Sequence, residues 1–164
     1  MQESIHYFLD HATAKVSLTV TDGQFIVETQ GKGALDKPRH IDILLSNLGH
    51  FCLVATVKAQ NLSNFRNAGD YSYDSEFIFS YREGQKIKNK RVFVNSRDVS
   101  FAEVLNELER KRPDASLLHL PPEQALEQIG AASAKKTLGL FLILLIGIPV
   151  LIAFVFIILK IIRP

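Results

Sequence analysis

The amino-acid sequence predicts an α+β fold in which antiparallel strands are followed by one amphipathic helix and then by a transmembrane helix. Short runs of alternating apolar and polar residues between residues 14 and 95 indicate the strands. An apolar stripe at helical spacing after Ser100 indicates the amphipathic helix. Residues 137–159 carry no charged side chain and indicate the transmembrane helix.

The N-terminal residues predict a short helix and then a hairpin. Residues 1–13 are assigned to the helix because three apolar residues share one helical face: Ile5, Phe8 and Leu9. In the next segment Val16, Leu18 and Val20 alternate with polar residues, and Asp22-Gly23 is a typical two-residue hairpin turn. We therefore expect paired strands on either side of Asp22-Gly23.

The middle of the chain predicts further strands. Residues 41–45 and 51–57 are apolar enough for two of them, and residues 76–81 and 91–95 form a second predicted hairpin across a basic loop. Two segments rich in polar residues, glycine or proline are predicted to be loops: residues 30–39 and 61–74.

One well-defined helix is predicted after the strands. Ser100 and Glu103 have the spacing of a capping box at its start, and Pro113 ends it. Its apolar stripe consists of residues three or four apart: Phe101, Val104, Leu105 and Leu108. A shorter helix is expected from Leu120-Pro-Pro to Ile129.

This order of about six strands and one amphipathic helix resembles a pleckstrin-homology-like (PH-like) domain over roughly residues 14–113, most closely in residues 76–113. The resemblance rests on element order and helix chemistry, and not on a signature motif. It implies a partly open antiparallel β-barrel whose open end is capped by the C-terminal helix. A different α+β sandwich is the alternative fold.

The first hairpin loop departs from the lipid-binding members of that family. In those members basic residues around this loop hold phosphoinositide phosphates, whereas here the loop is the short and acidic Thr21-Asp22-Gly23-Gln24. The resemblance therefore gives no support for inositol-phosphate recognition. Many PH-like domains bind proteins instead, so the fold alone leaves the ligand open.

The uncharged segment predicts a single membrane span at residues 137–160. At about 1.5 Å per residue, such a helix is long enough for the roughly 30 Å hydrocarbon core of a bilayer. Flanking cations and helix-packing residues are the predicted membrane anchor: Lys135, Lys136, Gly139, Gly147, Pro149, Lys160 and Arg163. Because no secretory signal is recognised before it, the sequence predicts a tail-anchored protein with a cytosolic N-terminal domain.

The resulting domain layout has five parts. A short helix at 1–13 precedes the PH-like domain at 14–113, and a helical linker at 114–136 leads to the span at 137–160 and a tail at 161–164. The chain holds 19 basic and 17 acidic residues, and Lys160 and Arg163 account for the difference. The domain before the span is therefore neutral, which argues against a nucleic-acid partner.

Two groups of residues are candidate contact sites. A basic run at the second hairpin is a possible contact for anionic lipid headgroups, and it consists of Arg82, Lys86, Lys88, Lys90 and Arg91. Aromatic and arginine side chains in or beside the long polar loop are a possible protein interface, namely Phe65, Arg66, Tyr71 and Tyr73. Each group has a simpler explanation, as a solvated loop in the first case and as a sheet-edge cover in the second.

Catalytic and metal-binding motifs are not recognised in the sequence. It contains no Gly-rich phosphate loop, no Gly-x-Ser-x-Gly and no HExxH. His50 and Cys52 are too few to hold a metal, and Cys52 is expected to be a small core residue. We expect no cofactor, no metal and no small-molecule substrate.

The sequence thus predicts a non-enzymatic, single-pass membrane protein whose domain mediates protein interaction. It would act as a scaffold or as an accessory subunit of a membrane complex, with other membrane-protein subunits as partners and lipid around residues 137–160. One alternative is an adaptor that binds anionic lipid through the basic hairpin. The other is an enzyme with an unrecognised site that includes His50 or Asp74.

Overall fold

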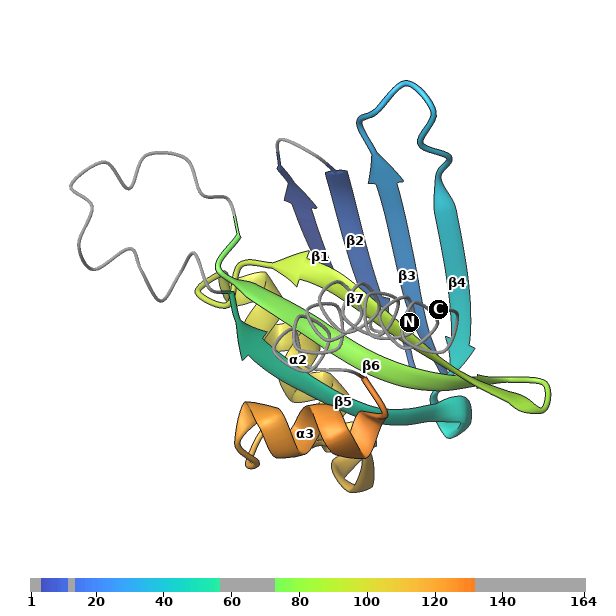
Figure 1. Cartoon of the computed structure of the whole chain (residues 1–164), viewed down its shortest axis with the longest axis vertical. Helices are drawn as coiled ribbons and strands as arrows, with labels where there is room; N and C mark the ends of the chain where they lie inside the picture. The colour runs from blue at the N-terminus through green and yellow to red at the C-terminus, as the bar shows by residue number, and fades with distance from the viewer. Residues whose placement is uncertain (1–3, 12–13, 57–72, 132–164) are drawn as a thin grey trace, which may run out of the picture. The chain divides into compact units, whose positions relative to one another are not determined.

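Seven strands in two antiparallel sheets make up about half of the chain that the computed structural model describes, which is residues 4–11, 14–56 and 73–131. The first sheet has the order β1-β2-β3-β4, and its strands are β1 (Ile5–Asp10), β2 (Ala14–Val20), β3 (Gln24–Gly31) and β4 (Arg39–Leu44). The second has the order β5-β6-β7, with β5 (Leu48–Ala55), β6 (Ser75–Glu83) and β7 (Lys86–Val94). Figure 1 shows the two sheets crossing each other.

The main core fills the space between the sheets. Strand residues alternate between this core and the outside, as the period of a β-strand requires, so that Leu18 and Val27 are buried while their neighbours are not. Aromatic rings dominate the centre: the rings of Phe25 and Phe79 meet edge to face with centroids 5.3 Å apart, and those of Tyr7 and Phe101 do so at 5.2 Å. Both sheets are therefore held by the same set of contacts.

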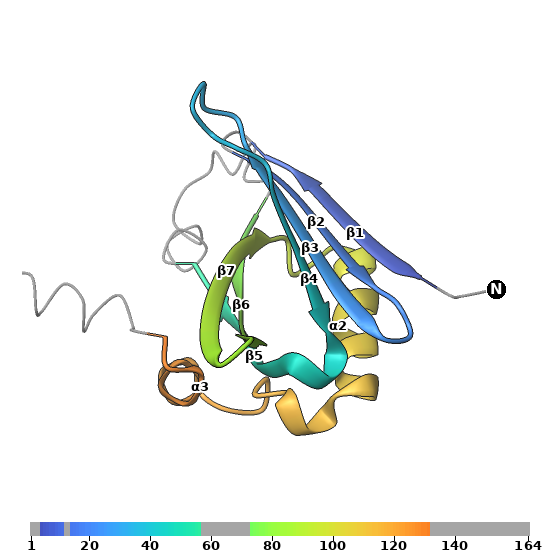
Figure 2. The same ribbon diagram turned by 90° about the vertical axis from the view of Figure 1, so that its right-hand side faces the viewer.

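Two α-helices follow the strands in the described part of the chain. Helix α2 (Val99–Lys111) packs on β1 and β2 and buries Phe101, Val104 and Leu108. Helix α3 (Pro122–Ile129) packs on β5, on the side of the second sheet that faces away from the first (Figure 2). Two short 3₁₀ turns lie at Leu45–Asn47 and Pro113–Ala115.

Several sequence predictions are confirmed. The hairpin at Asp22-Gly23 joins β2 to β3, and the N–H of Thr21 donates to the carbonyl of Gln24 across the turn at 2.9 Å. The strands predicted at 41–45 and 51–57 correspond to β4 and β5, and the second hairpin corresponds to β6 and β7. The predicted helix after Ser100 and the shorter helix to Ile129 are α2 and α3.

Three local predictions were wrong. Residues 5–10 form β1 instead of an N-terminal helix, because Tyr7 and Leu9 alternate into the core while Phe8 stays 52% exposed. The segment predicted as a basic loop is mostly strand, since the turn is only Gly84-Gln85 and Gly84 has the positive φ of 60° that such a tight turn favours. The α2 cap is Asp98, whose carboxylate accepts from the N–H of Ser100, and not Ser100 itself.

The predicted fold class with its transmembrane helix is also corrected. The structure is mostly β, with two antiparallel sheets and two short helices, and among the residues it describes no helix is long and apolar enough to cross a membrane. At about 1.5 Å per residue, α2 is roughly 20 Å long and α3 roughly 12 Å, less than the hydrocarbon thickness of a bilayer. The predicted span at 137–160 lies outside the described residues, and the single-pass, tail-anchored assignment with a cytosolic domain is corrected together with the fold class.

Candidate functional site

The outer edge of β4 carries backbone groups that no described strand pairs with. β4 is the last strand of its sheet and pairs only with β3 among the described strands (Figure 1). The N–H of Leu45 donates to the carbonyl of Gly23 at 2.9 Å, immediately beyond the last registered pair of β3 and β4. Hydrogen-bonded and non-hydrogen-bonded pairs alternate along an antiparallel ladder. The backbone groups that point away from β3 therefore belong to His40, Asp42 and Leu44.

A groove lies beside this edge, between β4 and the β6–β7 hairpin. It has a volume of about 590 Å³, and residues 38–41 line one side while Tyr81, Glu83 and residues 88–90 line the other. We call it the edge groove. Because its walls come from both sheets, the fold brings together segments about fifty residues apart in the sequence.

Cations dominate the charged groups of the edge groove. Arg39 contributes from β4 and Lys88 and Lys90 contribute from β7, against the single carboxylate of Glu83. Glu83 is already engaged in an ion pair with Lys88. Burial lowers the pKa of Lys90, and the nearby charge of Arg39 lowers it further. Arg39 thus lies near Lys90, and of the two only Lys90 is partly buried.

The outward face of the first sheet adjoins the same edge. There the imidazole of His40 lies between two carboxylates, with Nδ1 3.0 Å from Glu28 and Nε2 3.3 Å from Asp42. The hydrogen bond to Glu28 and then that to Asp42 raise the pKa of His40, because both carboxylates favour the imidazolium form. A second hollow of about 370 Å³ lies on this face, lined by Phe8, Arg39 and His40 among others.

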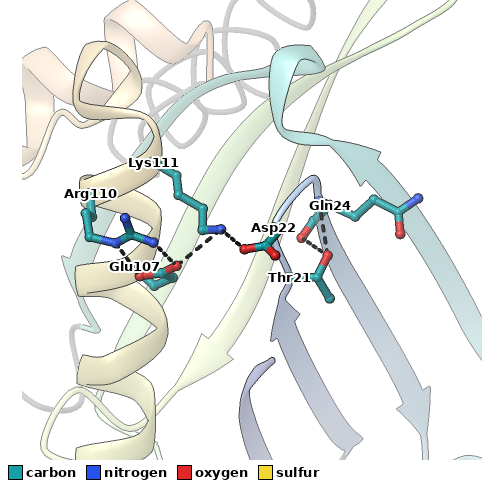
Figure 3. A network of polar contacts seen from close by, with 6 residues as sticks. All are labelled: Thr21, Asp22, Gln24, Glu107, Arg110 and Lys111. Carbon is teal, nitrogen blue, oxygen red and sulfur yellow. Dashed lines mark hydrogen bonds and ion pairs between the residues drawn. The ribbon is translucent and has the colours of Figure 1, made fainter. Parts of the chain in front are cut away.

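An ion pair joins the first hairpin turn to α2 (Figure 3). The ammonium group of Lys111 lies 3.0 Å from Asp22 in the turn and 3.3 Å from Glu107 one helical turn earlier. Arg110 donates two hydrogen bonds to the same Glu107 at 2.6 and 2.7 Å. The acidic turn at Asp22 is thus neutralised by the protein's own lysine.

The predicted basic run does not form one surface. Because strand side chains alternate, its members divide between the edge groove and the opposite face of the hairpin. Lys88 pairs with Glu83, and Arg91 lies 3.5 Å from Glu76. Arg82 and Lys86 are exposed near the turn. The headgroup contact proposed for these five residues remains a prediction.

The predicted aromatic interface can be located only at Tyr73. Its ring packs against Phe93 with centroids 4.7 Å apart and against the buried His11 at 5.1 Å. Phe65, Arg66 and Tyr71 lie outside the described residues, as do all seven predicted membrane-anchor residues. Tyr73 therefore packs beside Phe93 of β7, and the protein interface proposed for these four residues remains a prediction.

Asp74, Cys52 and His50, which were considered for catalysis or metal binding, are each described by their contacts and burial. The carboxylate of Asp74 accepts from the N–H and the hydroxyl of Ser96 at 2.8 and 2.9 Å and so fixes the turn after β7. Cys52 is 1% exposed, and burial raises the pKa of its thiol to about 11. His50 Nδ1 is buried without a hydrogen-bond partner in the described structure. No group of three metal-ligating side chains occurs in the part of the chain that is described.

Sequence reasoning missed Arg39, His40 and the free edge of β4. Residue 39 was placed at the end of a loop, and nothing in a single sequence shows which strand stays unpaired on one side. The alternation His40-Ile41-Asp42-Ile43 was the available signal, because it marks a strand with one polar face. Comparison with protein-family models, with curated proteins and with solved structures gave no match for this chain.

Proposed function

We propose that this domain is a non-enzymatic protein-interaction module that receives an extended segment of a partner protein along the free edge of β4. The observation that carries the proposal is the row of outward-pointing N–H and C=O groups at His40, Asp42 and Leu44. An unpaired strand edge is a template for another strand, and addition of a strand is a recurring way of binding peptides.

The surroundings of β4 favour strand addition there over addition at β5 or β1. On β5, the N–H of Leu117 donates to the carbonyl of Phe51 at 2.9 Å, and α3 packs alongside. On β1, α2 packs against the strand. Beside β4, by contrast, the edge groove provides space for the side chains of an incoming segment. Each new backbone hydrogen bond would contribute about 0.5–1.5 kcal/mol.

A non-enzymatic role is favoured by the engagement of three groups suited to acid–base chemistry. His40 is held between two carboxylates, Asp74 is hydrogen-bonded to Ser96, and the Cys52 thiol is buried with a raised pKa. These contacts stabilise one charge state of each group, whereas a general acid or base must exchange its proton near the working pH.

A proline at position 44 tests the proposal without disturbing the sheet. Leu44 has φ of −58° and ψ of 134°, which proline adopts without strain, and its side chain is 52% exposed. Its N–H points away from β3, so Leu44→Pro removes one edge donor and leaves the β3–β4 ladder complete. Leu44→Ala is the matched control, because it removes the side chain and keeps the N–H.

The assay selects peptides from a random displayed library on the full-length wild-type chain and measures their affinities for both variants. We expect the selected peptides to bind wild type and Leu44→Ala, to bind Leu44→Pro about two- to tenfold more weakly, and to slow amide exchange at His40, Asp42 and Leu44. Equal binding to Leu44→Pro, or protection of a different surface, would show that β4 is not the docking edge.

A further inference from the structure

We propose that the segment received by β4 is acidic, with carboxylate side chains at alternate positions that enter the edge groove and pair with Arg39 and Lys90. This inference rests on the proposed function and adds the chemistry of the partner. It follows from the charges on the two walls of the groove, from their lack of anionic partners, and from the period of a strand.

The cations of the edge groove are placed to meet one incoming segment. Arg39 is the first residue of β4, and Lys90 lies on β7 opposite Phe79 of β6. Both line the same groove, and the positive charge of Arg39 lowers the pKa of Lys90. A carboxylate that entered between them would contact a cation on each sheet.

These two cations lack a carboxylate partner in the described structure. The ion pairs formed there engage Lys88 with Glu83 but include neither Arg39 nor Lys90. Holding two like charges close together in a partly buried groove is unfavourable for both. A bound carboxylate reverses this by pairing with them, and charge-assisted hydrogen bonds are roughly twice as strong as neutral ones.

The outward face of β4 carries charges of both signs, because Lys15 and Arg39 line the hollow there. Glu28 and Asp42 lie there around His40, and Leu44 is exposed at the end of the strand. Alternate side chains of an added strand would point to the groove and to this outward face. An excess of cations is found only on the groove side, so acidic residues are favoured there and the outward side has no such preference.

Three capped octapeptides provide the probes: alternating Glu and Thr, alternating Gln and Thr, and alternating Lys and Thr. Their affinities for the full-length chain are measured by titration at low and at physiological salt. We expect the Glu peptide to bind at least about tenfold more tightly than the Gln peptide and the Lys peptide to bind most weakly. The advantage of the Glu peptide should fall as salt rises, because screening weakens partly exposed charge pairs.

Lys90→Met and Lys86→Met form a matched pair of variants. Methionine keeps the length of the side chain in both, but only Lys90 lines the edge groove, whereas Lys86 is exposed near the hairpin turn. Lys90→Met should remove most of the advantage of Glu over Gln, and Lys86→Met should leave it within about twofold, as expected for an exposed cation. Thermal unfolding of each variant checks that the domain stays folded.

The outcomes separate this inference from the proposed function. Equal binding of the Glu and Gln peptides, with both weakened in Leu44→Pro relative to Leu44→Ala, would overturn the acidic preference and leave strand addition standing. Glu-peptide binding that is equally strong in Leu44→Pro and Leu44→Ala would overturn strand addition. Competition by inorganic phosphate at the same concentration as the Glu peptide would overturn the inference in favour of a general anion site.

Discussion

Replacing Tyr7 by phenylalanine tests how the first strand is joined to the turn after β7. The Tyr7 side chain is fully buried, and its hydroxyl accepts a hydrogen bond from the backbone N–H of Asn95 at 2.8 Å. In Tyr7→Phe that N–H loses its acceptor inside the protein. Leaving a buried donor unsatisfied costs about 1–3 kcal/mol, so at neutral pH we expect the variant to be less stable by that amount.

The raised pKa of Tyr7 predicts how the stability difference between wild type and Tyr7→Phe changes with pH. Burial is the main reason that the pKa of Tyr7 is raised from 10.0 to about 12. In the unfolded chain the phenol loses its proton first, so the contribution of neutral Tyr7 to stability is complete below pH 10 and is lost as the pH rises from 10 to 12. At 1.36 kcal/mol per pKa unit, about 2.7 kcal/mol is lost over that range.

Urea unfolding of wild type and Tyr7→Phe between pH 8 and about pH 11.5 measures both effects. The free-energy difference between them should be constant up to about pH 10 and should then shrink by roughly 1.4 kcal/mol per pH unit, because only the wild type carries this phenol. Lysines titrate in both proteins and cancel in the difference. A constant difference up to the highest pH would refute the link between burial and titration of Tyr7.

Three other perturbations have expected outcomes. Asp98→Ala removes the α2 cap and should destabilise the domain by about 1 kcal/mol in urea unfolding, whereas Asp98→Asn, which can still accept from the Ser100 N–H, should cost less. Because burial raises the pKa of Cys52 to about 11, its thiol should react with a disulfide reagent at pH 8 only on unfolding, and rapid reaction of the folded chain would contradict its burial. The pKa of His40, followed by NMR, should lie above 6.5 and fall in Glu28→Gln, and the stability that its imidazolium contributes should be complete below pH 6.5 and lost as the pH rises through the folded-state pKa.

Local patterns were sufficient to predict the elements whose apolar residues fit one period only. Val16, Leu18 and Val20 alternate before a two-residue turn, and no helix buries all three on one face. The stripe in α2 fits helical spacing in the same unambiguous way: Phe101, Val104 and Leu108. In both cases the side chains that must leave water determine the backbone conformation.

The elements that were predicted incorrectly depend on contacts between distant residues. Ile5, Phe8 and Leu9 suit one face of a helix, but pairing with β2 turns residues 5–10 into a strand and leaves Phe8 exposed. The basic residues of β7 obscured its alternation, because an edge strand tolerates lysine at positions that a central strand would bury. The candidate site was harder still, since a free edge is defined by the strands that do not pair with it.

Two contacts between residues far apart in the sequence affect how the chain folds during synthesis. The contact of Tyr7 with Asn95 forms only after 88 further residues are made, and that of Asp22 with Lys111 only after 89. Contacts of such separation slow folding, because a long loop must close before they form. While β5–β7 and α2 are still being made, the inner faces of β1–β4, with Phe25 and Val27, have no partner to cover them. The nascent first sheet therefore exposes both an apolar face and an open edge, and at this stage of synthesis the chain is prone to associate with other chains.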